Sequence, residues 1–166
     1  MARNMQTKNG LMDSIQADFR KGNGFMYWGA ALAVGIIALL ILVTGVLLDS
    51  LVDIENHMEA WLCAYLLSIL LTLVMTAMDA VLTLVRQWSF VKRKSLLGGI
   101  VRVVVAVYRV ITLAGYGMAL VMGVFMAMRL AEAPVAALMI ALHLALMLTG
   151  YFGVRRMGKL FEEDAL

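Results

Sequence analysis

The sequence predicts an all-α, polytopic membrane protein: a four-helix bundle in a bilayer, with both termini on the cytoplasmic side and a short amphipathic helix at the N-terminus. Composition is the first of three observations that predict this fold. Of the 166 residues, 63% are hydrophobic and 15% are charged, and the mean hydropathy is +0.91. A soluble domain of this length could not bury so much apolar surface. The other two observations are four apolar segments of membrane-spanning length and a one-sided distribution of lysine and arginine.

We expect one membrane domain over residues 24–154, between a cytoplasmic tail over 1–23 and another over 155–166. No Gly/Ser/Pro-rich linker or block of like charge divides the chain. Basic residues before a first apolar stretch are also typical of secretory signals. This stretch is too long for a signal core, and its only A-x-A triplet lies at its start. We therefore expect it to stay attached as the first span.

The N-terminal tail carries a short helical pattern. Leu11, Ile15 and Phe19 recur every four residues, with charged residues between them. This spacing predicts an amphipathic helix that lies on the inner leaflet. The alternative is a solvated tail with a few apolar residues.

Four spans follow, because a helix needs about 20 apolar residues to cross the hydrocarbon core. We expect them over 25–48, 61–85, 96–128 and 135–154. The third has its apolar core over 110–128, preceded by an extension whose arginines can snorkel to the cytoplasmic interface. Pro134 suits the first turn of the fourth span, so the third and fourth spans should be antiparallel neighbours.

The basic residues set the orientation. Of 14 lysines and arginines, only Arg129 falls on the side opposite the termini in this topology. The connection over 49–59 has no basic residue and carries Asp49, Asp53, Glu55 and Glu59. The positive-inside rule makes the basic side cytoplasmic. We expect a multi-pass protein of a bacterial inner membrane.

Small residues at every fourth position predict close helix contacts, because they let backbones approach in lipid. The third span carries Gly115, Ala119, Gly123 and Ala127, the fourth carries Ala133, Ala137, Ala141, Ala145, Thr149 and Gly153, and the second carries Ala64, Ser68, Thr72, Thr76 and Ala80. The alternative is that small residues are simply common in membrane helices. The contacts can lie within one chain or between copies, and the number of stripes favours a homo-oligomer.

Asp79 is the only acidic residue inside a predicted span, and a carboxylate there needs a partner or a task. Counted along the helices at ~1.5 Å per residue, Asp79 and Arg109 lie at one depth near the inner interface. We expect a structural ion pair, with Arg102 as the substitute partner. The alternative, a proton-carrying carboxylate, would ordinarily lie nearer the midplane.

His143 does lie near the predicted midplane. Methionines accompany it at helical spacing: Met139 and Met147 in the fourth span, and Met118, Met122 and Met126 in the third. Thioether and imidazole ligands suit Cu(I), so these rows could line a path for a cation. The alternative is that the methionines fill gaps and the histidine bonds a neighbouring hydroxyl. Neither tail has a Cys or His cluster to load a metal, so no resident metal or cofactor is expected.

Enzyme motifs are not found. The chain has no G-x-S-x-G, no G-x-x-x-x-G-K-[ST], no H-E-x-x-H and no paired cysteines. His143 has only Ser68, Thr72 and Thr149 as candidate nucleophiles, all distant in the sequence or unaligned with it. We expect no catalysis.

The loop over 86–94 completes the polar inner surface, with Arg86, Trp88, Lys92, Arg93 and Lys94. It can contact anionic lipid or dock a soluble partner, and no nucleic acid is expected. Together these features predict a non-catalytic membrane subunit that self-associates or anchors a larger complex, such as a secretion, conjugation, defence or respiratory assembly. The alternative is a small channel or transporter for protons or cations, or for Cu(I), lined by His143 and the methionine rows.

Overall fold

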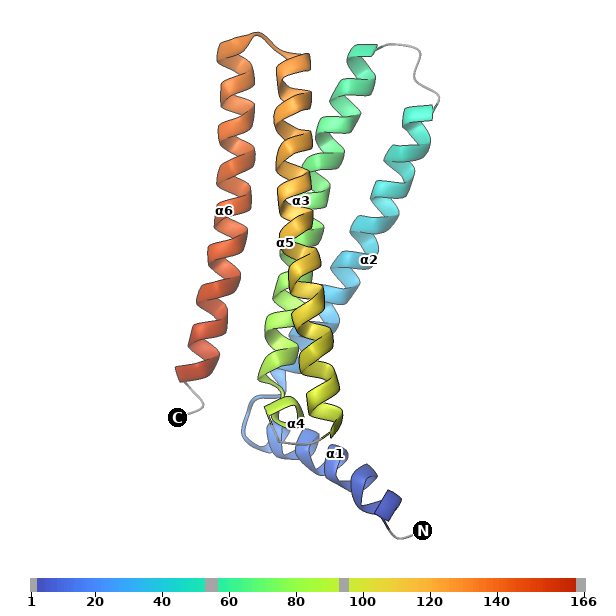
Figure 1. The fold of residues 1–166 in the computed structure, drawn as a ribbon, viewed down its shortest axis with the longest axis vertical. Coiled ribbons are helices and arrows are strands. Elements are labelled where there is room, and N and C mark those ends of the chain that lie inside the picture. The colour runs from blue at the N-terminus through green and yellow to red at the C-terminus, as the bar shows by residue number, and fades with distance from the viewer. Residues whose placement is uncertain (1–2, 53–56, 93–95, 164–166) are drawn as a thin grey trace.

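The fold is all-α, as predicted, with four long apolar helices after a short N-terminal helix (Figure 1). The computed structural model describes residues 3–52, 57–92 and 96–163, so Arg93 and Lys94 lie outside the described residues. The element order is α1 (Arg3–Arg20), α2 (Phe25–Val52), α3 (His57–Gln87), α4 (Ser89–Lys92), α5 (Leu96–Leu130) and α6 (Ala133–Glu163).

The four long helices are long and apolar enough to cross a membrane, over Phe25–Val46, His57–Gln87, Leu96–Leu130 and Ala133–Leu160. The chain is therefore a multi-pass membrane protein in contact with a lipid bilayer. α5 is continuous over 35 residues, so the third span and its basic extension are one helix.

α6 differs from the prediction at its C-terminal end. It continues to Glu163, where a tail was expected from residue 155. No proline interrupts this stretch, so the helix can continue past the predicted end of the span.

α3 lies at the centre of the arrangement. It packs against α2, α5 and α6, and α5 and α6 form an antiparallel pair beside it (Figure 1). α1 and the C-terminal end of α6 lie at the same end of the bundle, called the inner end below. At the opposite end Arg129 lies over the rings of Trp61 and Phe125, 5.9 Å and 5.4 Å from their centroids.

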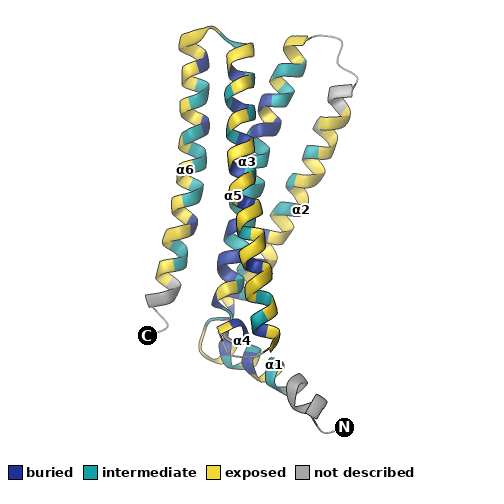
Figure 2. Cartoon of the chain, in the orientation of Figure 1, coloured by how far each residue is buried: buried dark blue, intermediate teal, exposed yellow. Residues whose placement is uncertain are grey.

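α2 contacts α3 mainly at the inner end. There Met26, Ala30 and Leu84 form a buried apolar cluster, with Trp88 and Met157 packed against it. Farther along, α2 leans away from the other helices, and its outer half is largely exposed (Figure 2). The bundle is therefore arranged around α3, against which α2, α5 and α6 all pack, and α2 diverges from the others toward the outer end.

α1 packs against α4, and its polar side chains are more deeply buried than its apolar row, in which Leu11 and Ile15 are half-buried. Ser14 and Asp18 are buried, whereas Phe19 is 48% exposed. Asp18 accepts a hydrogen bond of 2.7 Å from the Tyr27 hydroxyl. Gly22 makes the turn into α2 with a φ of 79°, a conformation that favours glycine.

The small-residue stripes divide into two groups. In α5, Ala119, Gly123 and Ala127 are buried and Gly115 is half-buried. In α6 the predicted stripe points away from the chain, because Ala137, Ala141, Ala145, Thr149 and Gly153 are all exposed. Of the two alternatives for this stripe, a contact within the chain is therefore not the one that the described residues make, and a contact between copies stays a prediction.

α6 instead turns its opposite face toward α3. That face carries His143, Gly150 and Val154, of which His143 and Val154 are buried and Gly150 is half-buried. The physical reason is that an imidazole is costly in lipid, so the rotation that buries it is preferred.

Candidate functional site

A row of polar side chains follows one face of α3, and we call it the polar seam. Its members are Ser68, Thr72, Thr76, Asp79 and Thr83. Steps of three and four residues place them on one side of the helix. Because lipid offers no hydrogen-bond partners, this side turns toward the neighbouring helices α5 and α6.

His143 meets the polar seam in its outer part. The imidazole is 2% exposed, and its Nε2 lies 2.8 Å from the Thr72 hydroxyl oxygen. Thr72 also lies 3.0 Å from the Ser68 carbonyl, to which its hydroxyl donates. Since the hydroxyl has one proton, Nε2 must then donate to Thr72. Thr72, distant from His143 in the sequence, is thus its hydrogen-bond partner, whereas Thr149 is exposed on another side of α6.

The surroundings of His143 are closely packed. A Cβ on Gly123 would collide with Nδ1 of the imidazole and lie 3.1 Å from the Ser68 hydroxyl oxygen. The Tyr65 ring stands edge-on to the imidazole at 6.1 Å, and its hydroxyl donates to the Met139 carbonyl at 3.0 Å. Nδ1 itself is buried with no hydrogen-bond partner among the described residues. Three helices are therefore joined at this level.

The methionines of the two predicted rows differ in how far they are buried. Met139 and Met147 are half-buried on the His143 side of α6, and Met122 and Met126 are half-buried on α5. Met118 is 69% exposed, so the α5 row does not face His143 as a unit. Within the described residues, no group of three or more His, Cys, Asp or Glu side chains could hold a metal ion.

Farther toward the inner end, Thr76 joins α3 to both neighbours. The Tyr116 hydroxyl donates to Thr76 Oγ1 at 2.9 Å. Gly150 of α6 faces the same threonine, since a Cβ there would lie 2.7 Å from Oγ1. Gly158 lies against Thr83 in the same way, nearer the inner end. A Cβ added to Gly158 would lie 3.0 Å from the methyl group of Thr83. Gly150 and Gly158 share the helix face of His143, and neither was among the predicted contact residues.

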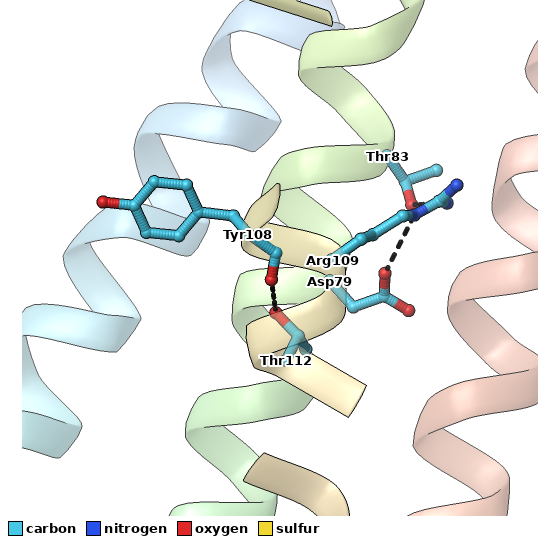
Figure 3. A network of polar contacts seen from close by, with 5 residues as sticks. All are labelled: Asp79, Thr83, Tyr108, Arg109 and Thr112. Carbon is cyan, nitrogen blue, oxygen red and sulfur yellow. Dashed lines mark hydrogen bonds and ion pairs between the residues drawn. The ribbon is translucent and has the colours of Figure 1, made fainter. Parts of the chain in front are cut away.

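Asp79 and Arg109 are brought together, at the common depth that helix rise predicted. Arg109 Nε lies 3.7 Å from Asp79 Oδ1, and an Arg109 amino group lies 3.5 Å from the Thr83 hydroxyl (Figure 3). The Asp79 side chain is 6% exposed and that of Arg109 is 24% exposed. Arg102, the predicted substitute partner, donates from its Nε to the Gly98 carbonyl of its own helix at 3.2 Å.

The loop after α3 is only partly available for docking. Arg86 and Lys92 are exposed. Trp88, predicted as part of the docking surface, instead stacks on Tyr27 at 4.8 Å, and Tyr27 stacks on Phe19 at 5.5 Å. The three stacked rings come from α1, α2 and the loop after α3, and they pack these segments against one another.

Three neighbouring cavities open at the inner end, of about 360, 180 and 340 Å³. Arg86 lines all three, and Arg102 and Arg109 each line two. The polar seam therefore ends in a basic region at the level of the predicted headgroups.

Comparison with protein-family models, curated proteins and solved structures found no match to this chain. What the chain does is therefore inferred from its own residues.

Proposed function

We propose that the chain is a non-catalytic membrane subunit that self-associates through the outward face of α6 and so anchors a larger membrane complex. One observation carries this proposal: the face of α6 that no helix of the chain covers is built from small residues. Its members are Ala133, Ala137, Ala141, Ala145, Thr149 and Gly153, all exposed. Small residues at this spacing let two helix backbones approach in lipid. A second copy of the chain is the simplest partner for such a face.

The polar seam supports a structural rather than a catalytic role. Its cross-links, among them Thr72 to His143 and Tyr116 to Thr76, join α3 to α6 and α5. Thr72 and His143 have the hydroxyl and the base that a nucleophilic site needs. However, Gly123 lies directly against the imidazole, and this close packing argues against a substrate site on that side of the ring.

Fluorescence energy transfer between labelled copies in lipid vesicles tests the self-association. Ala141→Phe places a ring on the outward face and should weaken association about tenfold, because it holds the backbones apart. Leu142→Phe is the matched control: Leu142 is 62% exposed on a neighbouring face, and this variant should associate like the wild type. A wild-type chain that stays monomeric at micromolar concentration would contradict the proposal.

A proton or cation channel is the second candidate, favoured by the buried, unpartnered Nδ1 of His143 at the outer part of the polar seam. Flux into vesicles that contain a pH-sensitive dye separates the two functions. A channel gives proton flux in the wild type that His143→Gln abolishes. The proposed subunit gives no flux above that of empty vesicles in either protein.

A further inference from the structure

Basic side chains gather around two cavities at the inner end. The cavity of about 360 Å³ lies between α3 and α5 and is lined by Arg86, Arg102 and Arg109 beside Val91, Val105 and Ala106. The cavity of about 180 Å³ lies between α3, α5 and α6, where Arg155 and Lys159 add to Arg86 and Arg109. Arg86 and Arg109 line both cavities, which are therefore neighbours.

Among the described residues, the charged groups that line the three cavities are all cationic. Asp79, the carboxylate bound to Arg109, lines none of them. Cations held this close repel one another unless an anion lies between them.

Within the part of the chain that the structure describes, Arg109 Nε and Gln87 Oε1 are buried without a hydrogen-bond partner. The 3.7 Å distance from Arg109 Nε to Asp79 is too long for a hydrogen bond. Gln87 lines the two cavities of about 180 and 340 Å³. A buried polar atom without a partner costs free energy, so a ligand that supplies one is favoured. A phosphate oxygen can accept from Arg109, and a hydroxyl beside the phosphate can donate to Gln87.

We propose that these neighbouring cavities bind the phosphate group of an anionic phospholipid from the inner leaflet. Arginine side chains bind phosphate through paired hydrogen bonds, and Arg86 and Arg102 approach the larger cavity from α3 and α5. Basic pockets between membrane helices at headgroup depth are typical of lipid recognition.

The apolar surface beside the cavity argues for a lipid over free phosphate, which shares the same chemistry. The wall of the larger cavity includes Val105 and Ala106, and Val103 and Val107 are exposed beside them on α5. Acyl chains attached to the phosphate would cover this surface, and inorganic phosphate would leave it bare.

Native mass spectrometry of the delipidated full chain in mild detergent tests the source of the phosphate. The probes are dioleoylphosphatidylglycerol, dioleoylphosphatidylcholine and inorganic phosphate. We expect the phosphatidylglycerol to bind at least about tenfold more tightly than the phosphatidylcholine, and millimolar inorganic phosphate to leave it bound. Equal binding of the two lipids, or binding of inorganic phosphate alone, would overturn the proposal.

Single-charge variants test the place of binding. Arg86→Gln should weaken phosphatidylglycerol binding about tenfold, which corresponds to ~1.4 kcal/mol. Arg156→Gln is the matched control, because Arg156 is exposed next to Arg155 but lines none of the three cavities. It should weaken binding less than about twofold.

Equal weakening in both variants would show general attraction to the basic surface and overturn the site. Size-exclusion elution and helical content check that each variant is folded. If Arg86→Gln is misfolded, Arg102→Gln replaces it, with the same expected loss of phosphatidylglycerol binding. Arg102 is suitable because, among the described residues, its hydrogen bond goes to the Gly98 carbonyl of its own helix.

Discussion

Gly123 is the residue on which the packing of α5 against α3 and α6 depends most directly. A methyl group there would collide with the His143 imidazole, which Thr72 holds in place. We expect Gly123→Ala to destabilise the fold by about 1–3 kcal/mol, the usual cost of overpacking. Thermal unfolding in mild detergent measures this.

Gly117→Ala is the matched control, on the same helix with no neighbouring atom within 4 Å of its added Cβ. It should unfold at or slightly above the wild-type temperature, because alanine favours a helix more than glycine does. Equal melting temperatures for the two variants would mean that the backbone of α5 does not lie against His143.

Asp79 is expected to act through stability rather than through proton transfer. Asp79→Asn leaves Arg109 without its counter-charge and should lower the melting temperature of the chain. The loss should be smaller than the about 3–5 kcal/mol of a fully buried pair, because the Arg109 side chain is 24% exposed.

Asp49→Asn, at an exposed position in α2, removes the same charge and should leave the melting temperature unchanged. The two variants are compared by thermal unfolding at several pH values. The proton-carrying alternative would be favoured if the Asp79→Asn protein were as stable as the wild type and its melting temperature depended differently on pH.

Depth along a helix could be predicted from the sequence, and rotation about its axis could not. Counting residues was enough to place Asp79 beside Arg109, because both are fixed by the ends of their spans. The pairing of Thr72 with His143 also depends on which side of α6 faces α3. Gly150 and Gly158, which share the His143 face, were the signal that could have indicated that side.

The helix α1 is attached to the bundle by a small number of contacts, so its docking can be weakened separately. Tyr27→Phe removes the hydrogen bond to Asp18 and keeps the ring that stacks between Phe19 and Trp88. A hydrogen bond to a charged group contributes about 1.5–3 kcal/mol. Backbone amides of α1 should therefore exchange hydrogen at least about tenfold faster in this variant.

Hydrogen exchange followed by mass spectrometry checks this expectation, with Tyr108→Phe on the exposed side of α5 as the control. Exchange in α3 should stay as slow as in the wild type in both variants. Unchanged exchange in α1 of Tyr27→Phe would show that the stacked rings alone hold this helix.

At the scale of whole helices, the sequence was sufficient for their number and order but not for all of their contacts. Apolar length located the four spans, because a membrane-spanning segment must be continuous. α6 is apolar on all sides, so from composition alone either its small-residue face or its His143 face could have pointed toward the lipid. The polar seam resolved this choice, since it offers His143 a partner that the outward face does not.

The whole molecule is more open than a closed four-helix bundle. α3 contacts the other three long helices, whereas α2 joins the core at the inner end and leans away beyond it (Figure 1). Which helices are neighbours depends on side-chain fit across the bundle, so the sequence did not predict this opening. The basic cavities, the stacked rings and the α1 dock all lie at the inner end, where a soluble partner or a lipid headgroup can reach them.

Sidedness in the membrane is the claim on which the lipid site and the anchoring role both depend. It can be measured with single cysteines in a Cys63→Ala background, since Cys63 is the only cysteine of the chain. Glu132→Cys lies in the turn between α5 and α6, and Lys92→Cys lies at the end of α4. A membrane-impermeant maleimide added to intact cells should label Glu132→Cys, and should label Lys92→Cys only after the membrane is permeabilised. Labelling of Lys92→Cys in intact cells, with Glu132→Cys protected, would contradict the account.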